Sequence, residues 1–189
     1  MGTRKLQIEE AKRDAAIRGK KGVSFILAGT LVWILITIVF YIPNLTLETK
    51  NILMLIATGS MFPMAVAMST LVKADWKLDG NPLNMLGLII NLAQFAYFPF
   101  IFWAFAHSPE QMVLFFAIIT AAHFFLYGWY YESKAYYVMA PVVSVLITAV
   151  GWNLEARQLW LVPAVMVVSL IVLSTWIMVE NKQIAMKEA

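Results

Sequence analysis

The sequence predicts an all-α, polytopic integral membrane protein folded as a bundle of six transmembrane helices. Two observations lead to this prediction. Hydrophobic residues make up 61% of the 189 residues and charged residues only 13%, which lies outside the usual range of soluble domains. In addition, apolar runs of about 20 residues, the length of a helix that crosses the hydrocarbon core, recur along the whole chain.

A basic, amphipathic tail over residues 1–21 comes first. Glu9 precedes Arg13 by four residues, and Asp14 precedes Arg18 by the same interval. This is the spacing of ion pairs along one face of a helix. We therefore expect a surface helix in the tail, ahead of the first span.

The six spans then follow one another with short connections. Together they form one transmembrane domain over residues 22–179, and a second short tail over residues 180–189 ends the chain. The expected spans are 22–42, 52–73, 83–105, 112–131, 135–153 and 159–179.

The lysine and arginine residues predict the orientation. Twelve of the fourteen lie in the two tails and in the second and fourth connections, whereas Lys50 and Arg157 lie on the other side. The positive-inside rule therefore places both termini in the cytoplasm, and the cell membrane, most simply the bacterial cytoplasmic membrane, is the expected location. The rule also explains the net charge of +3, so nucleic acid is not an expected partner, whereas membrane lipids are.

Prolines and an asparagine mark expected helix boundaries. Asn81 and Pro82 are expected to cap and begin the third span. Pro63 and Pro141 lie within the second and fifth spans, where each removes a backbone donor. We expect a helix break or hinge at both of these prolines.

Polar side chains inside the spans recur at helical spacing, which predicts that they face protein or a cavity rather than lipid. Asn91 and Gln94 share a face of the third span, and His123 and Tyr127 share a face of the fourth. We predict that such faces line an intramembrane cavity with aromatic walls. The predicted ligand-binding residues are Trp33, Asn91, Gln94, His123, Tyr127 and Ser144.

His123 is the one histidine expected near the middle of the bilayer. Because no Asp or Glu lies at that depth, we expect a neutral ring that points toward Asn91 and Gln94 and lies near Trp33. A purely structural interpretation is also open, in which these polar groups only hydrogen-bond one helix to another.

Several kinds of chemistry are disfavoured. The chain has no cysteine and only two, widely separated histidines, so we expect no disulfide, no metal site and no cofactor. A carboxylate in the middle of a span, which ion-coupled carriers usually need, is also missing.

Three functional hypotheses follow. In the first, the cavity binds or passes a hydrophobic or amphipathic small molecule or a lipid. In the second, the protein is an accessory subunit that pairs with itself or another membrane protein, since Ala117 and Ala121 would allow close helix contact. In the third, it is a lipid-modifying enzyme that uses His123 or the group Tyr130, Tyr131 and Glu132. The first is preferred, and an enzymatic activity is the less expected outcome.

Overall fold

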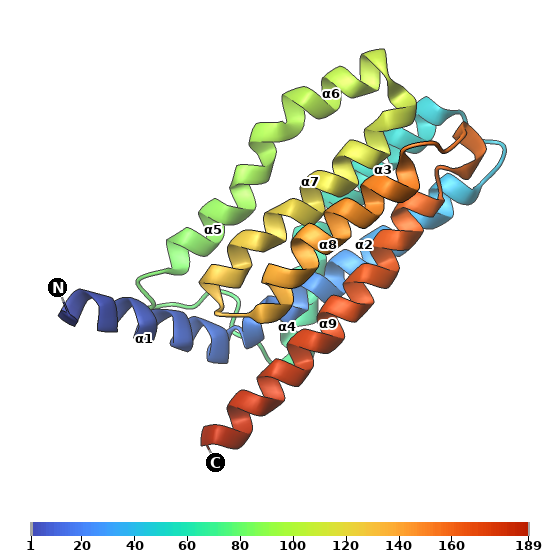
Figure 1. Ribbon diagram of the computed structural model, residues 1–189. Coiled ribbons are helices and arrows are strands. Elements are labelled where there is room, and N and C mark those ends of the chain that lie inside the picture. The colour runs from blue at the N-terminus through green and yellow to red at the C-terminus, as the bar shows by residue number, and fades with distance from the viewer. Residues whose placement is uncertain (1, 189) are drawn as a thin grey trace.

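The structure, a computed structural model, describes residues 2–188, and every regular element in that part of the chain is a helix (Figure 1). Met1 and Ala189, at the ends of the two predicted tails, lie outside the described residues. Five helical segments are long and apolar enough to cross a membrane, and the number rises to six if one bent helix pair forms a single span. The all-α prediction is therefore confirmed, together with the presence of several helices apolar enough to span a membrane.

The helices follow the expected spans closely, but two spans are divided. The second expected span is made of α3 and α4, and the third of α5 and α6. The elements are α1 (Gly2–Arg18), η1 (Lys20–Gly22), α2 (Val23–Tyr41), α3 (Leu47–Gly59), α4 (Met61–Val72), α5 (Asn84–Ala93), η2 (Gln94–Tyr97), α6 (Phe98–His107), α7 (Pro109–Tyr130), α8 (Lys134–Gly151), η3 (Ala156–Gln158) and α9 (Leu161–Glu188), where η marks a 3-10 turn.

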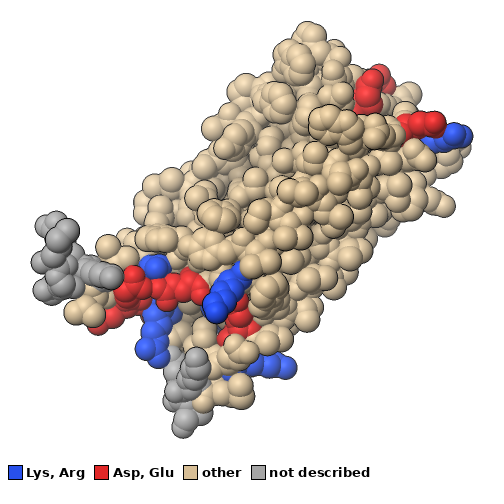
Figure 2. All heavy atoms as spheres, viewed as in Figure 1, with Lys and Arg blue, Asp and Glu red and all other residues tan. Residues whose placement is uncertain are grey.

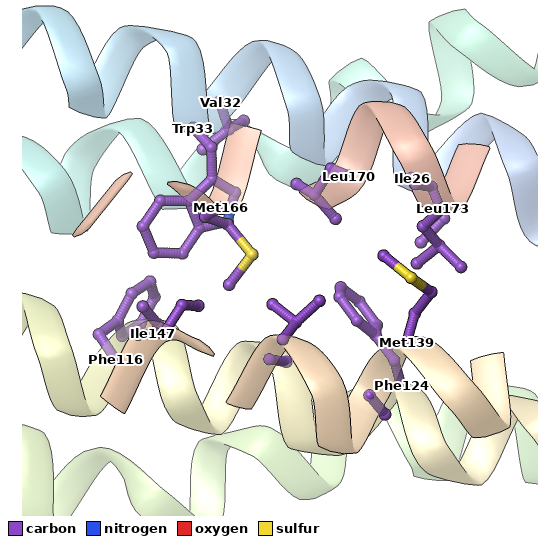
Figure 3. Packing of buried hydrophobic residues seen from close by; sticks show 14 of the residues in the cluster. Ile26, Val32, Trp33, Phe116, Phe124, Met139, Ile147, Met166, Leu170 and Leu173 are labelled. Atoms are coloured by element: carbon purple, nitrogen blue, oxygen red, sulfur yellow. The ribbon is translucent and has the colours of Figure 1, made fainter. Parts of the chain in front are cut away.

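The hydrophobic core lies where α2, α7, α8 and α9 meet. α2 packs against α9, α4 and α3, while α8 packs against α7 and α9. Trp33 from α2, Phe116 from α7, Ile147 from α8 and Met166 from α9 are all buried and lie close together in this core (Figure 3). Inside a membrane, such contacts stabilise the bundle through close packing, because lipid tails are as apolar as the side chains.

The second span bends by 42° between α3 and α4, at Ser60. Pro63 lies in the first turn of α4 and has no N–H to donate to the carbonyl of Gly59, the last residue of α3. The chain therefore breaks next to this proline. By contrast, α8 continues through Pro141 as one helix, so this proline does not divide the fifth span.

The third span contains a 3-10 turn, η2, that the sequence analysis did not anticipate. Pro99, at the start of α6, lacks the N–H that would reach the carbonyl of Phe95, and this carbonyl accepts from the N–H of Phe98 instead. The span is also the least buried. Only 11% of its apolar window is buried, against 33–50% in the other four unbroken spans. The α5–α6 segment thus stands partly apart from the bundle.

The N-terminal helix α1 lies across one end of the bundle (Figure 1). Ala15 and Ala16 are buried there, and Asn81 Nδ2 donates to the carbonyl of Ala11 at 2.8 Å. The expectation that Asn81 caps the third span is wrong, because α5 begins only at Asn84. The amide of Asn81 fastens α1 to the connection between α4 and α5 instead.

Charged side chains gather mainly at the end of the bundle that carries α1 and the last turns of α9, and a few lie at the opposite end (Figure 2). The first group is held by ion pairs that join distant segments. Lys12 pairs with Glu132 at 2.9 Å, and Lys21 pairs with Glu180 at 2.7 Å. On the face shown in Figure 2, the belt between the two ends carries no charged side chain, as expected of a surface that meets lipid.

Candidate functional site

A cavity of about 940 Å³ lies between the α5–α6 segment and the rest of the bundle. It exists because α5 and α6 pack against α7, whereas α4, on the other side, packs against α2. Residues of α2, α5, α6 and α7 form its walls, and the α3–α4 bend contributes Gly59 and Met61. The connection between α4 and α5 closes the end near α1, through Trp76, Lys77 and Leu78.

The structure brings five of the six predicted ligand-binding residues to this cavity, namely Trp33, Asn91, Gln94, His123 and Tyr127. The sixth, Ser144, is not among the lining residues. Its hydroxyl donates to the carbonyl of Ala140 at 2.8 Å, within α8. Because α8 packs against α7 and α9, only Tyr136, near its start, reaches the cavity.

One face of α7 forms the most continuous wall. Phe116, Thr120, His123 and Tyr127 follow one another at steps of four, three and four residues, which places them on one side of the helix. Phe116 also meets Trp33 of α2, with 5.9 Å between the ring centroids. Trp33 is only 3% exposed. The wall is therefore aromatic, with polar groups at regular intervals.

The opposite wall, on α5 and η2, carries two amides. Asn91 donates to the carbonyl of Gly87 at 3.2 Å, and Gln94 donates to the carbonyl of Asn91 at 3.4 Å. These bonds stay within one helical segment. Among the described residues, neither amide reaches another helix, and no hydrogen bond joins Gln94 to His123, whose ring was expected to point toward it.

Several polar atoms of the cavity lining lack a protein partner within the described residues, and three of them lie along the aromatic walls of α2 and α7: Trp33 Nε1, His123 Nε2 and Tyr127 Oη. None of the three is sealed from open space. The cavity thus offers unsatisfied hydrogen-bonding groups among aromatic walls.

A group of tyrosines also lines the cavity, and two of them, Tyr131 and Tyr136, were not among the predicted ligand-binding residues. Tyr136 donates to the carbonyl of Lys21 at 2.9 Å, and the ring of Tyr131 stacks on that of Tyr127, with 5.8 Å between centroids. One sequence pattern could have pointed to these tyrosines. The segment "GWYYESKAYY", residues 128–137, places four tyrosines within ten residues around a turn.

The connection that closes this end is held by an ion pair. Arg18 donates through Nη2 to Asp75 Oδ2 at 2.5 Å and through Nε to the same oxygen at 3.2 Å. The hydrogen bond from Arg18, followed by backbone donors such as Leu78 N, lowers the pKa of Asp75 below its ordinary value of 3.8. The α4–α5 connection is therefore tied directly to α1.

The acid–base set considered for an enzyme is not assembled. Glu132 pairs with Lys12 and does not line the cavity, whereas His123 lines it. Tyr130 donates to the carbonyl of Leu83 at 3.2 Å. Within residues 2–188, no three His, Cys, Asp or Glu side chains come together in a way that would hold a metal ion.

Comparison with known proteins gives one match. Residues 8–180 match DUF7010, which is described as a family of unknown function. The chain belongs to the DUF7010 family. No curated protein matches it, and no solved structure does. The matched range of this DUF7010 protein includes every residue that lines the cavity.

Proposed function

We propose that this DUF7010 protein is a six-span membrane protein whose cavity binds, or passes, a hydrophobic or amphipathic small molecule or a lipid. In this proposal α3 and α4 form one bent span, residues 22–179 lie in the membrane, and both tails lie in the cytoplasm. The cell membrane, most simply the bacterial cytoplasmic membrane, is the location. The charge-free belt and the unequal distribution of lysine and arginine support this placement.

The observation that carries the binding proposal is the unpaired polar lining of the cavity. Trp33, His123 and Tyr127 present hydrogen-bonding atoms without protein partners to a space with aromatic walls. Small-molecule sites have this composition, with mostly apolar walls and a few well-placed polar groups. A structural role for these side chains predicts hydrogen bonds between helices, and none is formed by these three atoms within the described residues.

The arrangement also favours entry from the membrane. Because α4 packs on α2 and α5 packs on α7, the cavity lies between two separately supported helices. Phe62 on α4 and Phe95 on η2 line the cavity and are 54% and 58% exposed. In this proposal, a ligand dissolved in the bilayer enters between these helices without crossing the charged end of the bundle.

A pair of matched variants tests the proposal. Thr120 lines the cavity and donates to a carbonyl of its own helix, and Thr148 makes the same bond in α8 away from the cavity. We expect native mass spectrometry of the protein, extracted in mild detergent, to show a retained ligand in the wild type and in Thr148→Phe. Thr120→Phe, which places a bulky ring in the cavity on the α7 wall, should retain several-fold less of it, because the ring takes space beside the polar groups that would hold the ligand. Equal retention in both variants, or no ligand in the wild type, would contradict the proposal.

A further inference from the structure

The hydrogen bonding of His123 determines what its free nitrogen can recognise. Nδ1 lies 2.9 Å from the carbonyl oxygen of Thr120, and a carbonyl can only accept, so Nδ1 donates. A neutral imidazole carries a single N–H, and its other nitrogen then has a lone pair. His123 Nε2, without a protein partner among the described residues, is therefore a hydrogen-bond acceptor.

The neighbouring ring on the same face of α7 carries a group that can donate. Tyr127 is one turn further along α7, and its ring meets the ring of His123 edge-on, with 5.5 Å between centroids. Its hydroxyl can donate and accept, and it makes no hydrogen bond to a described protein group. A ligand hydroxyl would satisfy both groups at once, because it can donate to His123 Nε2 and accept from Tyr127 Oη. An ether or a carbonyl can only accept and would leave Nε2 unpaired.

The surroundings exclude a charged ligand group at this depth. The charged residues among the described lining, Lys77 and Asp79, both belong to the connection that closes the end near α1. A charge beside His123 would lose its hydration without gaining a counter-charge. Elsewhere the walls are aromatic, with Phe98, Phe102 and Phe116 among them. They suit an apolar skeleton.

We propose that the cavity selects an uncharged, largely apolar molecule that carries a hydroxyl group, as a lipid alcohol or an alkylated phenol does. His123 Nε2 accepts its hydrogen, and Tyr127 Oη donates to its oxygen. This inference rests on the proposed function and adds the chemical class of the ligand. No covalent bond forms or breaks when the ligand binds.

Three probes of nearly equal size test this selectivity: para-dodecylphenol, its methyl ether and dodecylbenzene. The protein is placed in phosphatidylcholine nanodiscs, and its thermal unfolding midpoint is followed as the mole fraction of each probe rises. For the wild type we expect half-saturation by the phenol at a mole fraction about tenfold lower than for the ether, which lacks the hydrogen bond to His123 Nε2. Dodecylbenzene, which lacks both hydrogen bonds, should need a higher mole fraction than the ether.

Variants assign the effect to the named atoms. His123→Phe removes the acceptor and should abolish the preference for the phenol over the ether. Tyr127→Phe removes the donor and should reduce the preference for the phenol over dodecylbenzene about threefold or more. Ser144→Ala, outside the cavity, should leave the preference unchanged. Equal half-saturation by phenol and ether in the wild type, or an undiminished preference for the phenol over the ether in His123→Phe, overturns the hydroxyl inference but leaves the proposed function standing. If none of the probes shifts the thermal unfolding midpoint of the wild type, the result contradicts both the hydroxyl inference and the proposed function.

Discussion

At the scale of single residues, Gly128 of α7 shows how closely α7 and α8 approach each other. A Cβ atom added at Gly128 would lie 2.6 Å from Cδ1 of Tyr137, a ring atom of a residue on α8. We expect Gly128→Ala to lower the free energy of unfolding by about 1–3 kcal/mol, because the ring and the helix must move apart. Thermal unfolding in detergent measures this.

Gly59 supplies the matched control, since a Cβ there meets nothing within 4 Å. Gly59→Ala should be neutral, or stabilising by up to about 1 kcal/mol, because alanine restricts the unfolded chain. If both variants unfold at the same temperature, α7 and α8 do not approach each other as closely at Gly128 as described here.

At the scale of elements, the contact between α1 and the α4–α5 connection closes one end of the cavity, and its ion pair should make stability depend on pH. The pKa of Asp75 is lowered in the folded state by Arg18, so its contribution is complete above the ordinary value of 3.8 and is lost as the pH falls through the lowered folded pKa. We expect Asp75→Asn to unfold at a lower temperature than the wild type near neutral pH, with a difference below about 1 kcal/mol because both partners are partly exposed.

The difference between wild type and Asp75→Asn should stay nearly constant from neutral pH down to about the ordinary pKa of 3.8 and shrink as the pH is lowered further. Arg157→Gln is the control, since Arg157 pairs with Glu155 at 2.9 Å on an open surface and makes no contact with α1. It should change the unfolding temperature little. A pH-independent difference for Asp75→Asn would contradict the role given to its carboxylate.

At the scale of the whole molecule, both ends of the described chain lie at the end of the bundle where most charged side chains gather (Figures 1 and 2). Because the chain has no cysteine, single cysteines report the orientation directly. We expect a membrane-impermeant maleimide to label Asn44→Cys in intact cells, and to label Glu10→Cys and Gln183→Cys only after the membrane is made permeable. Labelling of Glu10→Cys and Gln183→Cys in intact cells would reverse the proposed orientation.

The sequence alone predicted the features that depend on segment length and helical period. Apolar runs as long as the membrane is thick predicted where the helices lie, since a helix satisfies its own backbone groups in lipid. The period of 3.6 residues placed His123 and Tyr127 on one face of α7, and Asn91 and Gln94 on one face of α5–η2, and all four line the cavity.

Only the tertiary structure decided which of these faces meet. Ser144 belongs to an equally regular polar face, but α8 packs between α7 and α9, so that residue lies away from the cavity. Asn81 binds α1 rather than capping a helix, and Tyr136 reaches the cavity from the start of α8. Helical period determines which residues share a face, but the rotation of each helix about its axis, and therefore the neighbour that the face meets, is chosen by packing among all the helices.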